Sequence, residues 1–371
     1  MKRFVSFVLL ILAPLLLQLL LQPRSYADDF RVAFGSCSRT DLDQPLWDAV
    51  LGRDPDLWIW TGDIVYADTT KAEVFKAKYD KQKRQPGYAA VVGAMPVIGV
   101  WDDHDYGRNG GGKEFTAKRV AQRALLEFLD EPGESARWTR DGIYDSGLYA
   151  GGRVKVILLD TRFNRDKPGE NGDVLGPNQW AWLEAELAGS DAQFHLIVSS
   201  IQVVPQEHRY EKWANFPASR DRLFRLIAQH RVPGVVFLSG DRHIGELSRR
   251  DTQPYPLYDI TSSSMTHSWS TFPGEPNSQR VGEVFTGLNF GEIHIDWDTG
   301  RVDIGLVDRN GVDVLALEVP FADLGVDPSQ VSGLSRITNP SQGTDSSQVT
   351  DPYRIADPAQ ITDSAKITDP S

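Results

Sequence analysis

An apolar run, Asp56-Leu57-Trp58-Ile59-Trp60, leads into the polar string Gly62-Asp63-Ile64-Val65-Tyr66, and this succession of strand and turn recurs along the chain. Further apolar runs bounded by turn residues lie at Phe30–Phe34, Met95–Trp101, Val154–Leu159, Phe194–Ser199 and Gly234–Leu238. Helical patterns lie among them at Leu46–Leu51, Phe115–Leu129, Asn178–Leu187 and Ala218–Gln229. Buried strands that alternate with helices indicate an α/β architecture.

The later part of the sequence changes to consecutive strands. They are expected at Leu257–Thr261, Gly291–Asp296, Arg301–Val307 and Val312–Pro320, with Asp308-Arg309-Asn310-Gly311 as a hairpin turn. Together with the alternating part, they predict two mixed sheets that pack together and are flanked by helices.

The composition is that of a folded, acidic protein. Of the 371 residues, 40% are hydrophobic, including 10 Trp, 11 Tyr and 16 Phe, which is ample for a large core and excludes wholesale disorder. Asp and Glu number 51 against 39 Lys and Arg, so the net charge is −12. This excess argues against nucleic acid as the main partner, because phosphate backbones demand a basic face. The single cysteine, Cys37, excludes an intrachain disulfide.

The first 27 residues have the pattern of an export signal. Lys2-Arg3 gives a positive start, residues 4–21 are almost purely apolar, and Ser25-Tyr26-Ala27 offers small residues for cleavage. The apolar run is also long enough for an uncleaved membrane anchor. Because Pro14 and the small-residue site favour cleavage, we expect residues 1–27 to be a signal peptide. The mature protein is then exported, periplasmic or extracellular, and has no membrane span.

From Ile337 onward a six-residue unit recurs, as in Val349-Thr350-Asp351-Pro352 and Ile367-Thr368-Asp369-Pro370. Hexad repeats can build a β-helix, but a unit with about one aliphatic residue and often a proline buries too little surface for one. We therefore expect residues 326–371 to form a flexible, disordered tail, with weak cation binding or surface attachment as the alternative. Residues 28–325 are expected to form the folded domain.

Polar motifs collect where the predicted strands end. Four of them each follow an apolar run: Gly35-Ser36-Cys37, Gly62-Asp63-Ile64-Val65-Tyr66, Trp101-Asp102-Asp103-His104-Asp105-Tyr106 and Gly240-Asp241-Arg242-His243. Ligands in α/β sheets bind beyond the carboxyl ends of strands, so the four motifs are expected to converge on one crevice. A Gly-Asp pair after a strand is often only a turn. Four motifs that hold a thiol, a phenol, several carboxylates and two histidines nevertheless predict a polar metal site.

The side chains in these motifs limit the kind of metal. Thiolate, phenolate, carboxylate and imidazole form a mixed anionic set suited to a transition metal, ferric iron among them. Asp63, Asp103 and Asp241 provide the hard oxygens that Ca²⁺ or Mg²⁺ prefers. Two neighbouring metals would clamp the attacking and leaving oxygens of a phosphoryl displacement, and Asp63 is the natural bridging carboxylate. The alternative for Cys37 is a buried, inert thiol.

These motifs resemble those of the alkaline phosphatase D family, a branch of the calcineurin-like metallophosphoesterases. The resemblance runs from about Phe30 to Pro320 and includes further strings in the same order. They are Tyr144-Asp145-Ser146-Gly147, Leu158-Leu159-Asp160-Thr161-Arg162, Leu175-Gly176-Pro177-Asn178-Gln179-Trp180-Ala181-Trp182-Leu183, Ala214-Asn215-Phe216-Pro217-Ala218 and Thr261-Ser262-Ser263-Ser264-Met265-Thr266-His267-Ser268. The resemblance implies a four-layer α/β/β/α sandwich of two mixed sheets, with a dinuclear metal site at the strand ends.

The resemblance also implies a set of metal ligands. One metal, iron in the family, would be held by Cys37, Asp63, Tyr66 and His243. Asp63 would bridge to a second metal, usually calcium, which Asp103 and Asp241 also hold. Related metallophosphoesterases often place Asn and His ligands around that metal, so the carboxylates here favour Ca²⁺ over Zn²⁺. The implied pair is Fe(III) with Ca(II), and other divalent metals are the alternative.

The function implied by the resemblance is that of an exported, metal-dependent phosphatase. It would hydrolyse small phosphate monoesters, diesters or both by attack of a metal-bound hydroxide, with residues 28–325 as the catalytic domain. The alternatives are a phosphodiesterase or phospholipase D-like enzyme acting on lipid or nucleotide diesters, and a surface-binding protein that uses the acidic tail beside an idle core. We expect a monomer. Longer family members carry a β-rich domain ahead of the core, whereas this chain is expected to enter the core directly after its signal.

Three residues are candidates for catalysis. His104 would protonate the leaving group or bind a phosphate oxygen, the alternative being an orienting contact to Asp103. Arg162 would grip phosphate with its forked guanidinium, or form a buried salt bridge with Asp160. His267 would line the pocket or cap the turn that precedes it.

Further side chains are expected around the metals and the substrate. The polar layer around the ligands is expected to consist of Asp102, Asp105 and Asp160. Within it, Asp105 would fix the tautomer of His104. Arg108 and Asn109, followed by Gly110–Gly112, would form a mobile rim over the substrate.

Overall fold

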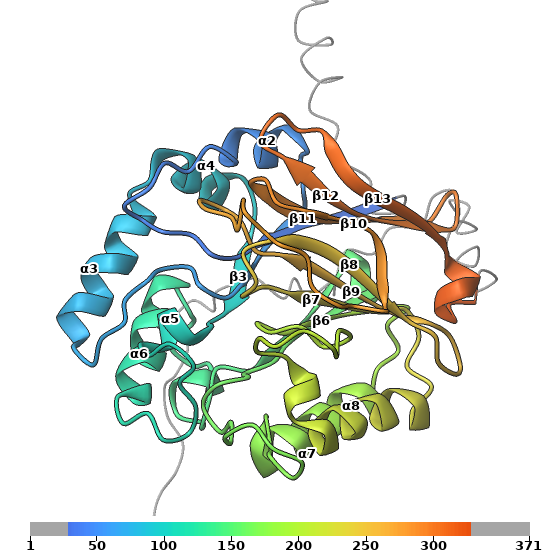
Figure 1. Ribbon diagram of the computed structural model, residues 1–371, viewed down its shortest axis with the longest axis horizontal. Coiled ribbons are helices and arrows are strands. Elements are labelled where there is room, and N and C mark those ends of the chain that lie inside the picture. The colour runs from blue at the N-terminus through green and yellow to red at the C-terminus, as the bar shows by residue number, and fades with distance from the viewer. Residues whose placement is uncertain (1–28, 328–371) are drawn as a thin grey trace, which may run out of the picture. The chain divides into compact units, whose positions relative to one another are not determined.

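The computed structural model describes residues 29–327, and its elements form a mixed α/β fold (Figure 1). The predicted signal peptide and nearly all of the predicted tail lie outside the described residues. Among residues 29–327, no helix is both long and apolar enough to cross a bilayer.

The first sheet has six strands in the order β13-β12-β11-β1-β2-β3. They are β1 (Asp29–Gly35), β2 (Leu57–Thr61), β3 (Val97–Val100), β11 (Asn289–Asp296), β12 (Arg301–Asp308) and β13 (Asp313–Pro320). Strands β1, β2 and β3 run parallel, and β11, β12 and β13 continue the sheet in antiparallel pairs. The predicted hairpin turn is present, because the N–H of Asp308 donates to the carbonyl of Val312 at 2.9 Å.

The second sheet has seven strands in the order β10-β8-β9-β7-β6-β5-β4. They are β4 (Asp145–Tyr149), β5 (Val154–Leu158), β6 (Phe194–Val198), β7 (Val235–Ser239), β8 (Gly245–Arg250), β9 (Leu257–Ser262) and β10 (Arg280–Phe285). Strands β5, β6, β7 and β9 are parallel, whereas β4, β8 and β10 pair antiparallel with their neighbours. Both sheets are therefore mixed, as predicted.

Hydrophobic cores lie on both faces of the second sheet. Along β6, Leu196 and Val198 belong to the core shared with the first sheet, whereas Ile197 belongs to a second core on the opposite face. This alternation explains why the strand reads as an unbroken apolar run. The second core is covered by α7 (Gly176–Ala188) and α8 (Pro217–Gln229), which contribute Leu183 and Leu223.

Further helices pack with the first sheet. They are α2 (Trp47–Gly52), α3 (Ala72–Lys83), α4 (Pro86–Ala94) and α6 (Lys118–Phe128). The ring of Trp47 lies 5.0 Å from that of Trp58 and 5.6 Å from that of Trp60, both on β2. Tyr79 of α3 stacks on Phe128 of α6 at 4.8 Å. In Figure 1 the strands lie between α2 and α4 on one side and α7 and α8 on the other, which is the predicted four-layer α/β/β/α sandwich.

The structure contains elements that the sequence analysis does not predict. They are α3, α4, the short helix α5 (Asp103–Tyr106), and the strands β4, β8 and β10. Short 3-10 helices lie at Ala136–Trp138, Ala150–Gly152, Trp213–Asn215 and Phe321–Leu324. Of these additions, α5 matters most for the site because it begins at a predicted metal ligand.

Candidate functional site

Parallel strands of the two sheets end near one another, and the predicted motifs follow them there. Cys37 comes two residues after β1, Asp63 two residues after β2 and Asp241 two residues after β7. All three have a positive φ, of 61°, 48° and 70° respectively, which residues other than glycine rarely adopt. Such strain persists only where surrounding contacts hold it, and it is typical of functional sites.

Two glycines allow these turns to approach one another. Gly62 has a φ of 105°, and a Cβ atom there would lie 2.6 Å from the Cβ atom of Asp102. A Cβ atom at Gly240 would lie 2.9 Å from the carbonyl oxygen of Thr61. Gly240 follows a strand of the second sheet, whereas Thr61 belongs to the first. In each Gly-Asp pair, the absence of a side chain at the glycine therefore allows a neighbouring loop or strand to approach the turn closely.

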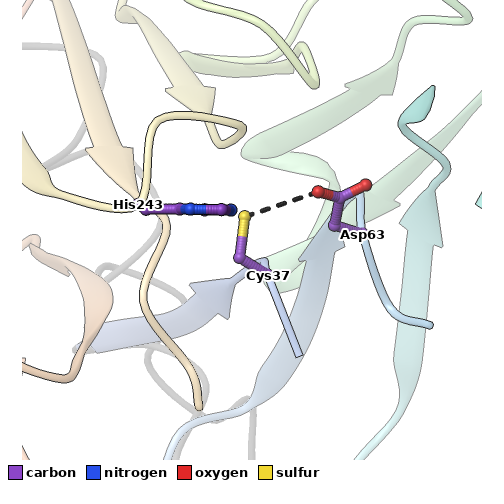
Figure 2. Close-up of side chains that lie close together, drawn as sticks. All are labelled: Cys37, Asp63 and His243. Carbon is purple, nitrogen blue, oxygen red and sulfur yellow. Dashed lines mark hydrogen bonds between the residues drawn. The ribbon is translucent and has the colours of Figure 1, made fainter. Parts of the chain in front are cut away.

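The first group that could hold a metal consists of Cys37, Asp63 and His243 (Figure 2). Their ligand atoms lie within 4.8 Å of one another, and the Cys37 thiol donates to Oδ2 of Asp63 at 3.6 Å. Burial, together with the Asp63 carboxylate, raises the pKa of this thiol, so the sulfur keeps its proton unless a cation is near. The hydroxyl of Tyr66 lies 3.0 Å from Nε2 of His243. The structure thus brings together the four side chains predicted around one metal.

His267 lies against this group. Its Nε2 lies 3.2 Å from the hydroxyl of Tyr66, and its ring centroid lies 4.4 Å from that of His243. Burial, reinforced by nearby cationic groups, lowers the pKa of both imidazoles to about 4. Both rings are therefore neutral at pH 7 and offer a nitrogen lone pair. His267 thus contacts two of the candidate ligands, but it is not among the residues that line the cavity described below, and a role for it in binding stays a prediction.

A second group is built mainly from carboxylates. Ligand atoms of Asp102, Asp103 and Asp241 lie within 4.8 Å of one another. The same holds for Asp63, Asp103 and His104. Asp63 thus belongs to one group with Cys37 and His243 and to another with Asp103 and His104. That it bridges two metals stays a prediction.

Helix α5 fixes the position of Asp103. The helix begins with a capping box in which the carboxylates of Asp102 and Asp105 accept each other's backbone N–H groups. The N–H of Gly110 donates to Oδ2 of Asp103 at 2.7 Å. The helix therefore places the backbone of Asp103, and the glycine-rich rim holds its carboxylate.

Burial and mutual repulsion act on the clustered carboxyl groups. Both effects raise the pKa of Asp63 and of Asp241, and burial is the larger cause in each case. Burial would also raise the pKa of Asp103, but the Arg162 guanidinium and other nearby groups outweigh it and lower that pKa. Oδ2 of Asp102 is buried and has no hydrogen-bond partner among the described residues. A cation would relieve both the repulsion and the unpaired oxygen, so these residues fit a metal.

His104 is oriented by Asp68 and not by Asp105. Its Nδ1 lies 2.7 Å from Oδ1 of Asp68. The predicted contact from Asp105 is wrong, because that carboxylate accepts backbone N–H groups from the Gly62–Tyr66 turn, at 2.9 and 3.1 Å. Asp105 therefore supports the turn that carries Asp63.

Arg162 is fully buried and does not line the cavity described below. Its Nε donates to Oδ1 of Asp102 at 2.7 Å, and its Nη2 lies 2.5 Å from the carboxylate of Glu211. The predicted salt bridge with Asp160 is wrong, because Asp160 accepts the backbone N–H of Arg162 while the guanidinium pairs elsewhere. The predicted grip on phosphate is not supported by this geometry either. Arg162 instead orients Asp102.

Arg165 and Asp160 hold the surrounding loops. Nη1 of Arg165 contacts the carboxylate of Glu211, and its Nη2 donates to the carbonyls of Gly110 and Gly111 at 2.6 and 2.9 Å. Glu211 thus joins two arginines, one that holds Asp102 and one that holds the rim. Asp160 lies in the layer beyond, where it accepts the indole N–H of Trp101 at 3.0 Å.

A cavity of about 470 Å³ opens beside the carboxylates. It is lined by Asp103, Asn109, Gly110, Tyr210, Glu211, Asp241, Arg242, His243 and Trp269. Asn109 lies at the rim as expected, whereas Arg108 is exposed and does not line the cavity. Sequence reasoning gave no role to Tyr210, Glu211, Arg242 or Trp269. The only available signal was their place within or beside the quoted motifs.

Comparison with known proteins assigns the family. The model of the PhoD-like phosphatase family matches residues 32–270, which is more than half of the chain. The chain belongs to the PhoD-like phosphatase family. This confirms the predicted resemblance to the alkaline phosphatase D family. Alkaline phosphatase D of Bacillus subtilis (strain 168) is 24% identical over 210 residues, a match that covers 48% of this chain and 36% of that protein. The matched region thus spans about a third of the length of this curated relative.

Two solved structures have a similar fold. A structure of PhoD matches with a TM-score of 0.64 and 16% identity, over 81% of this chain and 70% of that one. GAP50, described as the anchor in the inner membrane complex of Plasmodium, matches with a TM-score of 0.55 and 14% identity, over 82% of this chain and 93% of that one. At these identities the likeness shows the fold alone. A protein described as an anchor shares the fold, so the chemistry of this chain depends on the side chains at the strand ends and not on the fold.

Proposed function

We propose that this PhoD-like chain is an exported, metal-dependent phosphatase that hydrolyses small phosphate esters, with residues 28–325 as its catalytic domain. The observation that carries the proposal is the position of Asp63 between two groups of different chemistry. A thiol, a phenol and an imidazole lie on one side of it, and further carboxylates lie on the other. Membership of the family supports the class of reaction.

The two groups suit two different metals. Cys37, Tyr66 and His243 would hold Fe(III), because thiolate and phenolate are ligands that calcium does not select. Asp103 and Asp241 would hold Ca(II), and Asp63 would contact both ions. Bound there, the ions would lower the pKa of a water molecule and neutralise charge on the phosphoryl oxygens.

His104 is the chain's own candidate for proton transfer. Its Nδ1 is paired with Asp68, so Nε2 is left to hold the proton that the leaving oxygen requires. The contact with Asp68 also fixes the orientation of the ring. Arg162 would act indirectly, because it does not line the cavity and orients Asp102 at the start of α5.

The proposal is tested by assaying the mature chain on p-nitrophenyl phosphate after reconstitution with iron, with calcium added or chelated. Calcium-dependent hydrolysis is expected. Asp63→Asn should lose bound metal, measured by mass spectrometry of the elements, together with turnover. The exposed Asp298→Asn should keep both and serves as the matched control. An Asp63→Asn protein that is active and fully metal-loaded would overturn the proposal.

A phosphodiesterase is the second candidate, because the cavity of about 470 Å³ leaves room for a second ester group beside the carboxylates. Bis(p-nitrophenyl) phosphate, assayed beside the monoester, decides between the two by the ratio of the rates. Export is tested separately by sequencing the amino terminus of protein recovered outside the cytoplasm. A start at Asp28 is expected, and a start at Met1 would contradict cleavage of the signal.

A further inference from the structure

Part of the cavity wall has no role in the candidate metal groups. Asp103, Asp241 and His243 mark the end at which a phosphoryl group would bind under the proposed function, on which this inference rests. Tyr210 and Trp269 line the cavity as well, from two other loops. We propose that these two side chains form a subsite for a planar aromatic ring carried by the alcohol part of the phosphoester.

The two rings are arranged to contact a third one. Their centroids lie 5.5 Å apart, and their planes are inclined at 84°. A planar ring that stacks on the face of one of them therefore lies nearly perpendicular to the other, which is the orientation of an edge-to-face contact. Offset stacking and edge-to-face contact are the two arrangements that aromatic rings prefer.

Both rings stand on braced loops. Buried Lys212 donates from Nζ to the carbonyl of Tyr210 at 3.2 Å, and Nδ2 of Asn215 donates to the same carbonyl at 3.1 Å. The N–H of Trp269 donates to the carbonyl of His243 at 2.7 Å. Because the backbone that carries both rings is held before a ligand arrives, binding requires less additional ordering of the loops.

The charged side chains of this wall are already paired. Nη2 of Arg242 lies 2.5 Å from Glu275, and its guanidinium lies 4.4 Å from the centre of the Tyr210 ring. Glu211 is paired with two buried arginines. A wall with neutralised charges and two aromatic rings favours an uncharged ring over a second anionic group. A nucleoside and a simple aryl alcohol both supply such a ring.

The experiment compares esters that differ in the ring but have similar leaving groups. Adenosine 5′-monophosphate is compared with ribose 5-phosphate, and benzyl phosphate with propyl phosphate, using the purified metal-loaded protein. For at least one pair, kcat/KM for the ring-bearing ester should be higher by about ten-fold or more, in line with the strength of stacking on aromatic side chains. The pair that shows the preference identifies the source of the ring.

Variants then assign the preference to the two side chains. Trp269→Ala and Tyr210→Ala should each bring the ratio of kcat/KM values toward one, and Trp269→Phe should keep most of the preference. Trp182→Ala removes a partly exposed tryptophan on α7, outside the cavity, and should leave the ratio unchanged. Ratios near one for both pairs in the unsubstituted protein would overturn the subsite. A preference for the ring-bearing ester that persists in both Trp269→Ala and Tyr210→Ala would overturn the subsite as well.

Failure of the proposed function gives a different result. A metal-loaded protein that hydrolyses none of the four esters would overturn the phosphatase, and the subsite is then tested by binding alone. Calorimetric titration with adenosine and with benzyl alcohol should give binding of at least one that Trp269→Ala abolishes. Binding of neither would overturn the subsite.

Discussion

The hydroxyl of Tyr66 lies 3.0 Å from Nε2 of His243, and this contact joins the two sheets of the sandwich. Tyr66 follows β2 in the first sheet, and His243 precedes β8 in the second. Arg162, which follows β5, reaches Asp102, which follows β3, in the same way. The candidate site is thus assembled at the junction of the sheets. Residues that hold this junction together should affect metal binding even where they do not touch the metals.

Glu211 is such a residue, and Glu211→Gln should weaken metal binding. The substitution removes the negative charge that Arg162 and Arg165 share while keeping the size of the side chain. Because Arg162 orients Asp102, we expect calcium affinity to fall by about 10–100-fold. The measurement is a calorimetric titration of calcium into metal-free protein.

The matched control is Glu127→Gln, which removes an exposed carboxylate paired with Arg123 on the surface of α6. Exposed pairs of this kind contribute little, so calcium affinity should not change. If Glu211→Gln also leaves the affinity unchanged, the two buried arginines hold the site without Glu211.

Asp68→Asn should lower kcat with little effect on KM. Asp68 accepts from Nδ1 of His104, so its loss frees the ring that is proposed to donate a proton. We expect kcat to fall by about 100-fold, the lower end of what a positioned proton donor contributes. Steady-state kinetics on an alkyl phosphate, whose leaving oxygen needs that proton, provides the measurement. Asp130→Asn, which removes a surface partner of Lys83, is the control, and an equal kcat for the two variants would contradict the role of Asp68.

The strands and the positions of the candidate metal-binding side chains could be predicted for a common physical reason. Strands such as β6 are buried on both faces, so Leu196, Ile197 and Val198 form a continuous apolar run that local sequence reveals. The candidate metal-binding side chains follow directly after such strands. Helix α3, in contrast, buries Phe75 and Tyr79 among charged residues, and the resulting pattern is too sparse to stand out.

The supporting contacts of the site could not be predicted, because they depend on how distant loops meet. Arg162 stands two residues from Asp160 in sequence, but its guanidinium pairs with Asp102, which is 60 residues away. His104 likewise pairs with Asp68 and not with its sequence neighbour Asp105. Spacing along the chain shows which charges are available, and only the packing of the two sheets selects the partners.

Gly62→Ala and Gly93→Ala should have opposite effects on stability. A Cβ atom at Gly62 would be strained by the positive φ and would lie 2.6 Å from the Cβ atom of Asp102, so we expect a loss of about 1–3 kcal/mol. Gly93 lies in α4, and a Cβ atom there would meet nothing within 4 Å. Alanine at that position should stabilise the protein by about 0.5–1 kcal/mol. Urea unfolding of the two variants measures both changes in the free energy of unfolding. A destabilised Gly93→Ala protein would contradict the finding that a Cβ atom at Gly93 meets no neighbouring atom.

His195 should make the stability of the fold dependent on pH. Its ring is buried in β6, with Nδ1 2.8 Å from the carbonyl of Pro233 and Nε2 2.7 Å from Oγ of Ser190, and burial lowers its pKa to about 4. The unfolded chain takes up this proton near pH 6.5, so the stabilisation is complete above that pH and is lost as the pH falls toward 4, by about 3 kcal/mol. In urea unfolding between pH 7 and 4.5, the advantage of the unsubstituted protein over His195→Gln should therefore shrink as the pH falls. A difference between the unsubstituted protein and His195→Gln that stays constant with pH would contradict a buried neutral ring.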